Sequence, residues 1–213
     1  MKGSSGVYNM SLSECDSSYG RAQLLESLRS YRPWNEQEAA DRDEILREIE
    51  HSQDIFTREN RNAHMTASSW IVDPSRTKAL MVYHNIYNSW SWTGGHADGE
   101  TDLLAVALRE AREETGIAYV HPLSSDIYSL EILTVDGHEK RGKYVSSHLH
   151  LNLTYLLEAD DSDSLICRED ENSAVAWFSL DDAVKASTEP WFQKRIYPKL
   201  NAKLTGIGRD AGC

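Results

Sequence analysis

The segment from Leu103 to Ile117 constrains the fold more than any other part of the sequence. Its apolar residues recur at helical spacing and form a stripe made of Leu104, Ala107, Leu108 and Ala111. Glu110, Glu113 and Glu114 stand at positions i, i+3 and i+4, so their carboxylates share a second face within one turn. We therefore predict a helix over about 101–115 that buries one side and presents three acids on another.

The three carboxylates on this predicted helix allow two interpretations. They repel one another by roughly 0.3 kcal/mol per pair, and Arg109 and Arg112 would offset part of this on a solvated face. Alternatively, the acids are gathered because a hard divalent cation takes oxygen ligands. The preceding loop contains Gly94 and Gly95, and it favours the second interpretation because glycine lets the backbone approach a metal or a phosphate closely.

Together, this loop and helix resemble the signature of the Nudix hydrolase family. That signature is Gly, five residues, Glu, seven residues, and then Arg-Glu-U-x-Glu-Glu-x-Gly-U, where U is apolar. It is carried here by Gly95 and by Arg109-Glu110-Ala111-Arg112-Glu113-Glu114-Thr115-Gly116-Ile117. A chance match to the second part alone is on the order of one in 10^4 for such a chain. There is one departure: counted from Gly95, the first Glu falls on Thr101, and Glu100 stands one residue early.

The resemblance implies a fold, an activity and a set of site residues. The fold would be a Nudix-like α/β/α sandwich with a mixed sheet. The activity would be Mg2+-dependent hydrolysis, with Mn2+ as an alternative ion, of a diphosphate linkage in a nucleoside diphosphate derivative or a similar compound. The implied metal ligands are Glu110, Glu113, Glu114, the backbone of Gly94 or Gly95, and Glu171. Catalysis would rest on Glu110, Glu113 and Arg109.

The roles that the resemblance implies within this set are as follows. Glu110, or a carboxylate from residues 169–171, would deprotonate the attacking water. Arg109 would orient the glutamates through a charge-assisted hydrogen bond. Glu171 stands just before the expected last strand, where the family often places another metal ligand; an exposed loop residue is the other interpretation.

Candidate substrate contacts lie outside the acidic face. His96 belongs to the glycine loop, Trp92 lies on a short strand before it, and Arg141 lies in a basic hairpin loop over 138–143. Core packing for Trp92 and a solvated tip for Arg141 are the alternative interpretations. His148 and His150 are two apart on an expected strand and so share one face, where they contact substrate or metal or act structurally.

The order of elements divides the chain into three parts. Residues 1–19 are polar and Ser-rich, so we expect a poorly ordered tail. Residues 20–60 form a helical N-terminal extension, broken at 31–33 and restarted by Asn35 as a cap with Glu38 three residues on. Residues 61–213 carry the α/β domain. Its expected strands lie at 67–72, 78–84, 90–92, 127–135, 144–157 and 174–178, and its last helices at 180–187 and 190–203.

Charge and cysteine content limit the partners and the compartment. The net charge of −12 argues against nonspecific nucleic-acid binding, which needs a basic face. No run of 18 apolar residues occurs, so we expect no membrane partner. The three cysteines, Cys15, Cys167 and Cys213, show neither metal-ligand nor disulfide spacing, which fits a reducing, cytoplasmic location. The expected partner is a small phosphorylated substrate, and a homodimer stays open.

Two other functions remain open from the sequence. Related isomerases of isoprenoid diphosphates use a catalytic cysteine, and Cys167 is the nearest candidate here. A Nudix-like sensor that binds a ligand without cleaving it is the second alternative. Such sensors often lack the carboxylates of the signature, whereas Glu110, Glu113 and Glu114 are all present.

Overall fold

Two long parallel strands form the centre of the molecule. The computed structural model describes residues 12–85, 88–140, 142–167 and 172–207. Strand β1 (Ala63–Val72) pairs in parallel with β9 (His148–Ala159) along its whole length, from Ala63 opposite Leu149 to Val72 opposite Glu158. Successive side chains of each strand point to opposite faces of the sheet, so apolar residues can form a separate core on each face.

The other sheet strands run antiparallel to this pair, which makes the sheet mixed. Beside β1 lie β2 (Lys78–His84) at one end and β4 (Thr93–His96) at the other. Beside β9 lie β6 (Ser129–Val135) and β5 (Val120–Pro122). The last two, β10 (Asn172–Ser179) and β3 (Ser89–Ser91), both pair with β2.

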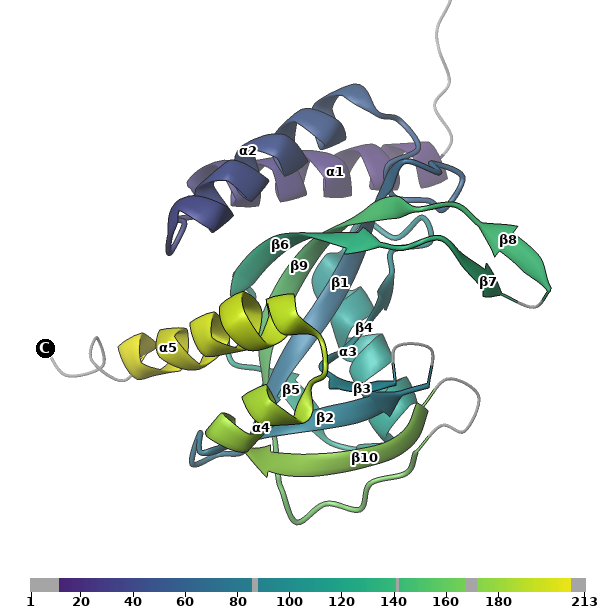
Figure 1. The fold of residues 1–213 in the computed structure, drawn as a ribbon. Coiled ribbons are helices and arrows are strands. Elements are labelled where there is room, and N and C mark those ends of the chain that lie inside the picture. Colours follow the sequence, from purple (N-terminus) through teal and green to yellow (C-terminus); the bar gives the residue numbers. More distant parts are fainter. Residues whose placement is uncertain (1–11, 86–87, 141, 168–171, 208–213) are drawn as a thin grey trace, which may run out of the picture.

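A separate hairpin projects from the sheet. Strands β7 (His138–Lys140) and β8 (Lys143–Val145) pair only with each other and extend beyond the body of the molecule (Figure 1). The expected single strand over 144–157 is therefore wrong: the chain leaves β8 and enters β9 at His148. A period-two pattern alone does not show where a strand changes its partner.

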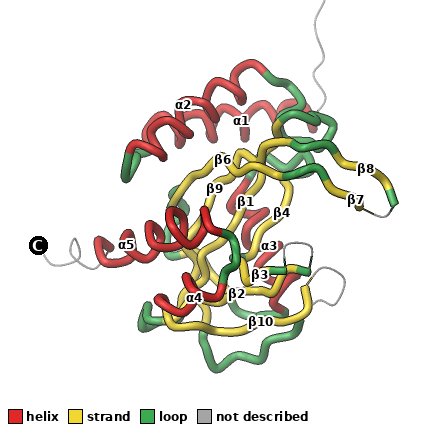
Figure 2. Tube along the Cα trace, in the orientation of Figure 1, coloured by secondary structure: helices red, strands yellow, loops and turns green. Residues whose placement is uncertain are grey.

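Helices cover both faces of the sheet and give an α/β/α sandwich (Figure 2). Helix α3 (Leu103–Thr115) lies on one face, where Val106 and Ala107 enter a large apolar cluster. On the other face, α4 (Leu180–Ala186), a π-helical turn (Phe192–Ile196) and α5 (Tyr197–Ile207) pack on a second cluster. The expected sandwich with a mixed sheet is confirmed.

The helical N-terminal segment packs into the same core as α3. Helix α1 (Leu12–Ser30) and helix α2 (Glu36–His51) contribute Leu28, Ile45 and Ile49, all 0% exposed, to the first cluster. Helix α1 already begins at Leu12, inside the segment for which we expected a poorly ordered tail. The tail before Leu12 lies outside the described residues.

A buried group of charges ties α2 to α5. Asn35 caps α2 as expected, because its side chain accepts a hydrogen bond from the Glu38 amide at 3.0 Å. The Glu38 carboxylate instead turns inward, 2.6 Å from Lys203 Nζ and 3.1 Å from Lys199 Nζ. Lys199 also contacts Glu131 of β6 at 2.8 Å. We call Glu38, Glu131, Lys199 and Lys203 the charge cluster.

The charge cluster keeps Glu38 ionised although that carboxylate is fully buried. Burial alone would raise its pKa, but Lys199 and Lys203 outweigh burial and hold the pKa at about 2. Helix α2 is thus joined to the C-terminal helix by paired charges. No helix among the described residues has the length and apolar character needed to cross a membrane.

Candidate active site

The three signature glutamates have fixed positions on helix α3, because both ends of the helix are capped and one of its faces is buried. Asp102 caps the first turn by accepting a hydrogen bond from the Ala105 amide at 3.1 Å. Gly116 ends the helix in the left-handed region at φ 67°. Between them, the apolar stripe is buried, so the turn carrying Glu110, Glu113 and Glu114 is fixed against β4 and β1. The predicted helix over 101–115 is confirmed within two residues.

Glu114 is the buried member of the three acids. Its side chain is held from two sides: Gly94 donates its backbone N–H to Oε2 at 3.0 Å, and Asn172 Nδ2 donates to Oε1 at 3.2 Å. The residue is only 7% exposed. These contacts join the helix to the glycine loop and to the start of β10, two places far apart in the sequence.

Gly95 forms a cradle for the second acid, Glu110. A Cβ atom at this position would lie 2.5 Å from Glu110 Cδ and 2.8 Å from each of its carboxylate oxygens. Only glycine therefore lets the carboxylate rest against the backbone of β4. Arg109 donates a hydrogen bond to Glu110 Oε1 at 3.0 Å.

The third acid, Glu113, is exposed on the same turn. The structure thus places Glu110 against Gly95 and Glu114 against Gly94, with Glu113 on the same turn of α3. A donor set made of carboxylate oxygens suits Mg2+ or Mn2+. The cradle at Gly95, which any side chain would fill, is the observation that shows these residues fit such an ion.

Other predicted residues have different surroundings. Glu100 accepts hydrogen bonds from the backbone amides of Thr101 and Asp102, at 2.8 and 2.9 Å, and so holds the chain before α3. Trp92 is 7% exposed and packs edge-on against Phe192 and Tyr197, which fits the packing interpretation.

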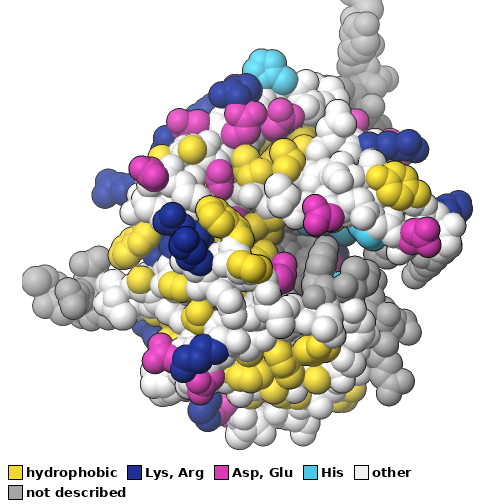
Figure 3. Space-filling view, in the orientation of Figure 1, with side chains coloured by type: hydrophobic (Ala, Val, Ile, Leu, Met, Phe, Trp, Pro, Cys, Tyr) yellow, Lys and Arg dark blue, Asp and Glu magenta, His cyan; other side chains and the backbone are white. Residues whose placement is uncertain are grey.

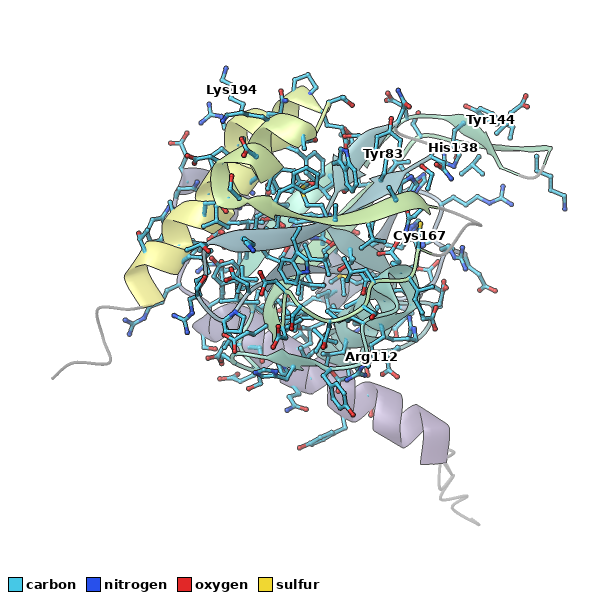
Figure 4. All side chains as sticks on the ribbon, turned by 90° about the horizontal axis from the view of Figure 1, so that it is seen from below. Tyr83, Arg112, His138, Tyr144, Cys167 and Lys194 are labelled. Atoms are coloured by element: carbon cyan, nitrogen blue, oxygen red, sulfur yellow. The ribbon has the colours of Figure 1, made fainter. Side chains whose placement is uncertain are left out.

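Two of the candidates expected from the sequence, Glu171 and Arg141, lie outside the described residues. The neighbour of Glu171, Asn172, contacts Glu114 directly. Arg141 follows β7 in the sequence; the hairpin residues His138 and Tyr144 lie in the same part of the view as Tyr83 when the molecule is seen from below (Figure 4).

Sequence reasoning missed two residues beside the site. Asn172 holds Glu114, and its position at the start of β10 was the only available signal. His64 lies at the beginning of β1, and its ring centroid is 5.1 Å from that of His96. The His64 contact depends on the pairing of β1 with β4, which local periodicity does not reveal.

Cys167 lies next to Asn172, the residue that contacts Glu114. Its Sγ donates to the backbone carbonyl of Asn172 at 3.2 Å, while the Asn172 side chain contacts Glu114. The thiol therefore contacts the first residue of β10, whose side chain contacts the Glu114 carboxylate.

The chain is similar to known proteins in sequence and in fold. The chain is 33% identical over 96 residues to an asymmetrical bis(5'-nucleosyl)-tetraphosphatase of Rattus norvegicus, a match that covers 44% of this chain and 58% of that relative. The chain thus spans less than two thirds of the curated relative. The structure of a C. elegans Ap4A hydrolase binary complex is similar with a TM-score of 0.50 and 20% identity, covering 68% of this chain and 98% of the other.

The family assignment rests on a longer match. The family model of the NUDIX domain matches residues 63–200, which include the whole sheet, α3, and the first residues of α5. The resemblance seen in the glycine loop and the acidic helix therefore extends over most of the domain. This chain belongs to the Nudix family.

Proposed function

We propose that this chain is a divalent-metal-dependent hydrolase that cleaves a diphosphate linkage in a nucleoside diphosphate derivative. The observation that carries the proposal is the placement of Glu110 against Gly95 and of Glu114 against Gly94, with Glu113 on the same turn of α3. A solvated charged face would need neither the cradle at Gly95 nor the two hydrogen bonds that hold Glu114.

The ion would be Mg2+, with Mn2+ as the alternative. Glu110, Glu113 and Glu114 would hold it, together with Glu171 and a carbonyl from Gly94 or Gly95. When bound, the ion would neutralise the diphosphate and stabilise the charge that develops during cleavage. The net charge of −12 makes such an ion necessary for binding an anionic substrate beside these acids.

The protein side chains would then position and deprotonate the attacking water. Glu110 is the proposed general base, since the Gly95 cradle and Arg109 fix its carboxylate in one place. Arg109 is a positioning residue that acts through Glu110. A carboxylate from residues 169–171 is the alternative base, and Arg141 remains our proposal for a phosphate contact from the hairpin.

The first substrate class to test is a dinucleoside tetraphosphate. The rat relative, named for asymmetrical cleavage of such compounds, shares 33% identity with this chain. A dinucleoside tetraphosphate contains several diphosphate linkages, so it also meets the chemical requirement of the proposed site.

Glu114→Gln tests the proposed function. The variant should keep its fold and lose turnover by about 100-fold, because the change removes a charge from the metal-binding face. Glu139→Gln, an exposed change on β7, is the matched control and should keep full activity. Circular dichroism and thermal unfolding would check the fold of both variants.

The assay would screen dinucleoside tetraphosphates, nucleoside triphosphates, nucleotide sugars and isoprenoid diphosphates with Mg2+ or Mn2+, with products separated by chromatography. Undiminished turnover in the Glu114→Gln variant would refute the assignment. Binding of a nucleotide without any product would support a sensor instead, and an isomerised diphosphate would support the isomerase alternative.

A further inference from the structure

Four histidines from three strands meet on one face of the sheet. His64 of β1 is the register partner of His150 on the parallel strand β9. His96 of β4 pairs with Thr66 of β1, two residues from His64, so its side chain points to the same face. His148 lies two residues before His150 and shares that face. In the space-filling view, histidine atoms are visible in a hollow below the β7–β8 hairpin (Figure 3).

The imidazole nitrogens of these residues converge. One ring nitrogen from each of His64, His96 and His150 lies within 4.8 Å of the other two, the only such metal-ligand set found among the described residues. His148 Nε2 lies 3.2 Å from His150 Nε2, and the His148 ring stacks on that of His64 with centroids 4.8 Å apart.

Backbone carbonyls fix the orientation of two of these rings. His64 donates from Nδ1 to the carbonyl of Asn60 at 3.0 Å, and His148 donates from Nδ1 to the carbonyl of Ser146 at 2.8 Å. In both rings, Nε2 then carries the lone pair. Metal-binding histidines are typically held in this way, with one nitrogen on a carbonyl and the other on the metal.

His64 Nε2 is the atom that packing alone leaves unexplained. His64 is 4% exposed, and its Nε2 has no hydrogen-bond partner in the structure. A buried polar atom without a partner costs about 1–3 kcal/mol. Within the group of histidines, His150 has a hydrogen-bond partner in His148. His64 Nε2 has none.

Burial also favours the form of histidine that binds metals. It lowers the pKa of His64, and it lowers that of His150 to about 2, with His96, His64 and His148 adding to the effect on His150. Neutral rings present lone pairs, whereas protonated rings would repel both one another and a cation.

We propose that His64, His96 and His150 bind a transition-metal ion of the Zn2+ type, with His148 as the fourth ligand. Imidazole nitrogens suit Zn2+, Co2+ and Ni2+, while the carboxylate face of α3 suits Mg2+, so the two sites select different ions. In a tetrahedral site with Zn–N distances of about 2.0–2.1 Å, ligand nitrogens lie about 3.4 Å apart. The 3.2 Å between His148 and His150 is already near this value.

The remaining nitrogens reach this spacing by side-chain rotation. Closing from 4.8 Å to about 3.4 Å requires a movement of roughly 1.4 Å, shared between two rings. Such an ion would join β1, β4 and β9 at one point. His96 directly follows Gly95, so the ion would also hold the end of the strand against which Glu110 rests.

Titration of the metal-free full chain with Co2+ would test the site. Four-coordinate Co2+ absorbs much more strongly in the visible range than Co2+ bound by six oxygens. We expect such a spectrum at one ion per chain, displaced by Zn2+ but not by an excess of Mg2+. Zn2+ should also raise the melting temperature, because it binds only the folded state.

Variants assign the spectrum to its ligands. His64→Ala and His150→Ala should each abolish the four-coordinate spectrum, and His150→Gln, which keeps more of the side-chain volume, guards against an unfolded His150→Ala. His121→Ala is the matched control, because His121 is exposed on β5 outside the group, and it should bind Co2+ like the wild type.

The outcome is independent of the proposed hydrolase activity. Glu114→Gln should keep the Co2+ spectrum even where it loses turnover. A wild-type chain that gives only the weak spectrum of six-coordinate Co2+ would overturn the proposal. The same holds for a strong spectrum that survives His150→Gln, or for one that Glu114→Gln abolishes.

Discussion

We expect Gly95→Ala to change the geometry of the carboxylate site while leaving the stability of the fold nearly unchanged. The new Cβ would meet no backbone atom among its nearest neighbours; it would meet Glu110 Cδ at 2.5 Å and both carboxylate oxygens at 2.8 Å. The backbone of Gly95 does not need a positive φ, so alanine adopts the same conformation. The strain therefore falls on the Glu110 side chain, which is flexible and can rotate away.

The size of the effect follows from this displacement. Non-bonded carbon atoms settle at about 3.5–4.0 Å, so the Glu110 carboxylate must move by about 1 Å. A misplacement of about 1 Å in a catalytic group can lower a rate by about 100-fold. This corresponds to about 2.7 kcal/mol of lost transition-state stabilisation. We therefore expect kcat to fall by about 100-fold while the melting temperature changes little.

Two other glycines serve as comparisons for Gly95→Ala. At Gly94, an added Cβ would lie 2.7 Å from the Ala67 carbonyl oxygen and 3.0 Å from Ser68 Cα, so Gly94→Ala should disturb the pairing of β1 with β4 and lower stability. At Gly206 on α5, an added Cβ meets nothing within 4 Å, so Gly206→Ala should leave kcat unchanged.

The measurement is kcat for diphosphate hydrolysis with Mg2+, together with thermal unfolding of each variant. If Gly95→Ala retains wild-type kcat in a folded protein, the carboxylate in its cradle has no part in the reaction. If Gly95→Ala unfolds as readily as Gly94→Ala, the assignment of the strain to the Glu110 side chain is wrong.

Three further predictions concern the charge cluster and the core. Glu38→Gln should lower the free energy of unfolding, measured with urea, by about 3 kcal/mol, because Lys199 and Lys203 lose a buried partner. Since the pKa of Glu38 is lowered from 4.5 to about 2, its contribution to wild-type stability is complete above pH 4.5 and is lost as the pH falls toward 2; acid unfolding of Glu38→Gln should lack this component. Trp92→Ala should cost about 3 kcal/mol of stability and leave KM unchanged, whereas a large rise in KM would favour a substrate contact. Leu28→Ala should also cost about 3 kcal/mol, and a cost near zero would show that α1 is not part of the core.

The acidic helix could be predicted from the sequence because its determinants are local. The apolar stripe, the glutamate spacing and the stop at Gly116 all lie within one segment, and α3 runs from Leu103 to Thr115. The cap at Asn35 is equally local and was also correctly predicted. Fold class followed from the family resemblance that this segment carries.

The long-range contacts could not be predicted in the same way. The pairing of His64 with His150 joins residues 86 positions apart on two parallel strands, and no short pattern encodes it. The pairing of Glu38 with Lys203 could likewise not be predicted from a short sequence pattern. A glutamate three residues after a cap normally turns back to the cap backbone. Here one oxygen of Glu38 accepts from the Trp34 amide next to the cap at 2.7 Å, while the other pairs with Lys203 of α5 in the core.

The charge cluster also has a consequence for the order in which the chain can fold. Glu38 and Lys203 are 165 residues apart, so the carboxylate can meet Lys203 only after α5 has been synthesised. Until then, α2 can form as a helix, but docking it would bury an unpaired charge. The central β1–β9 pairing also joins residues far apart in sequence, such as His64 and His150. We therefore expect the N-terminal helix pair to stay undocked, with its apolar side uncovered, until both the strands on which it packs and α5 have been synthesised.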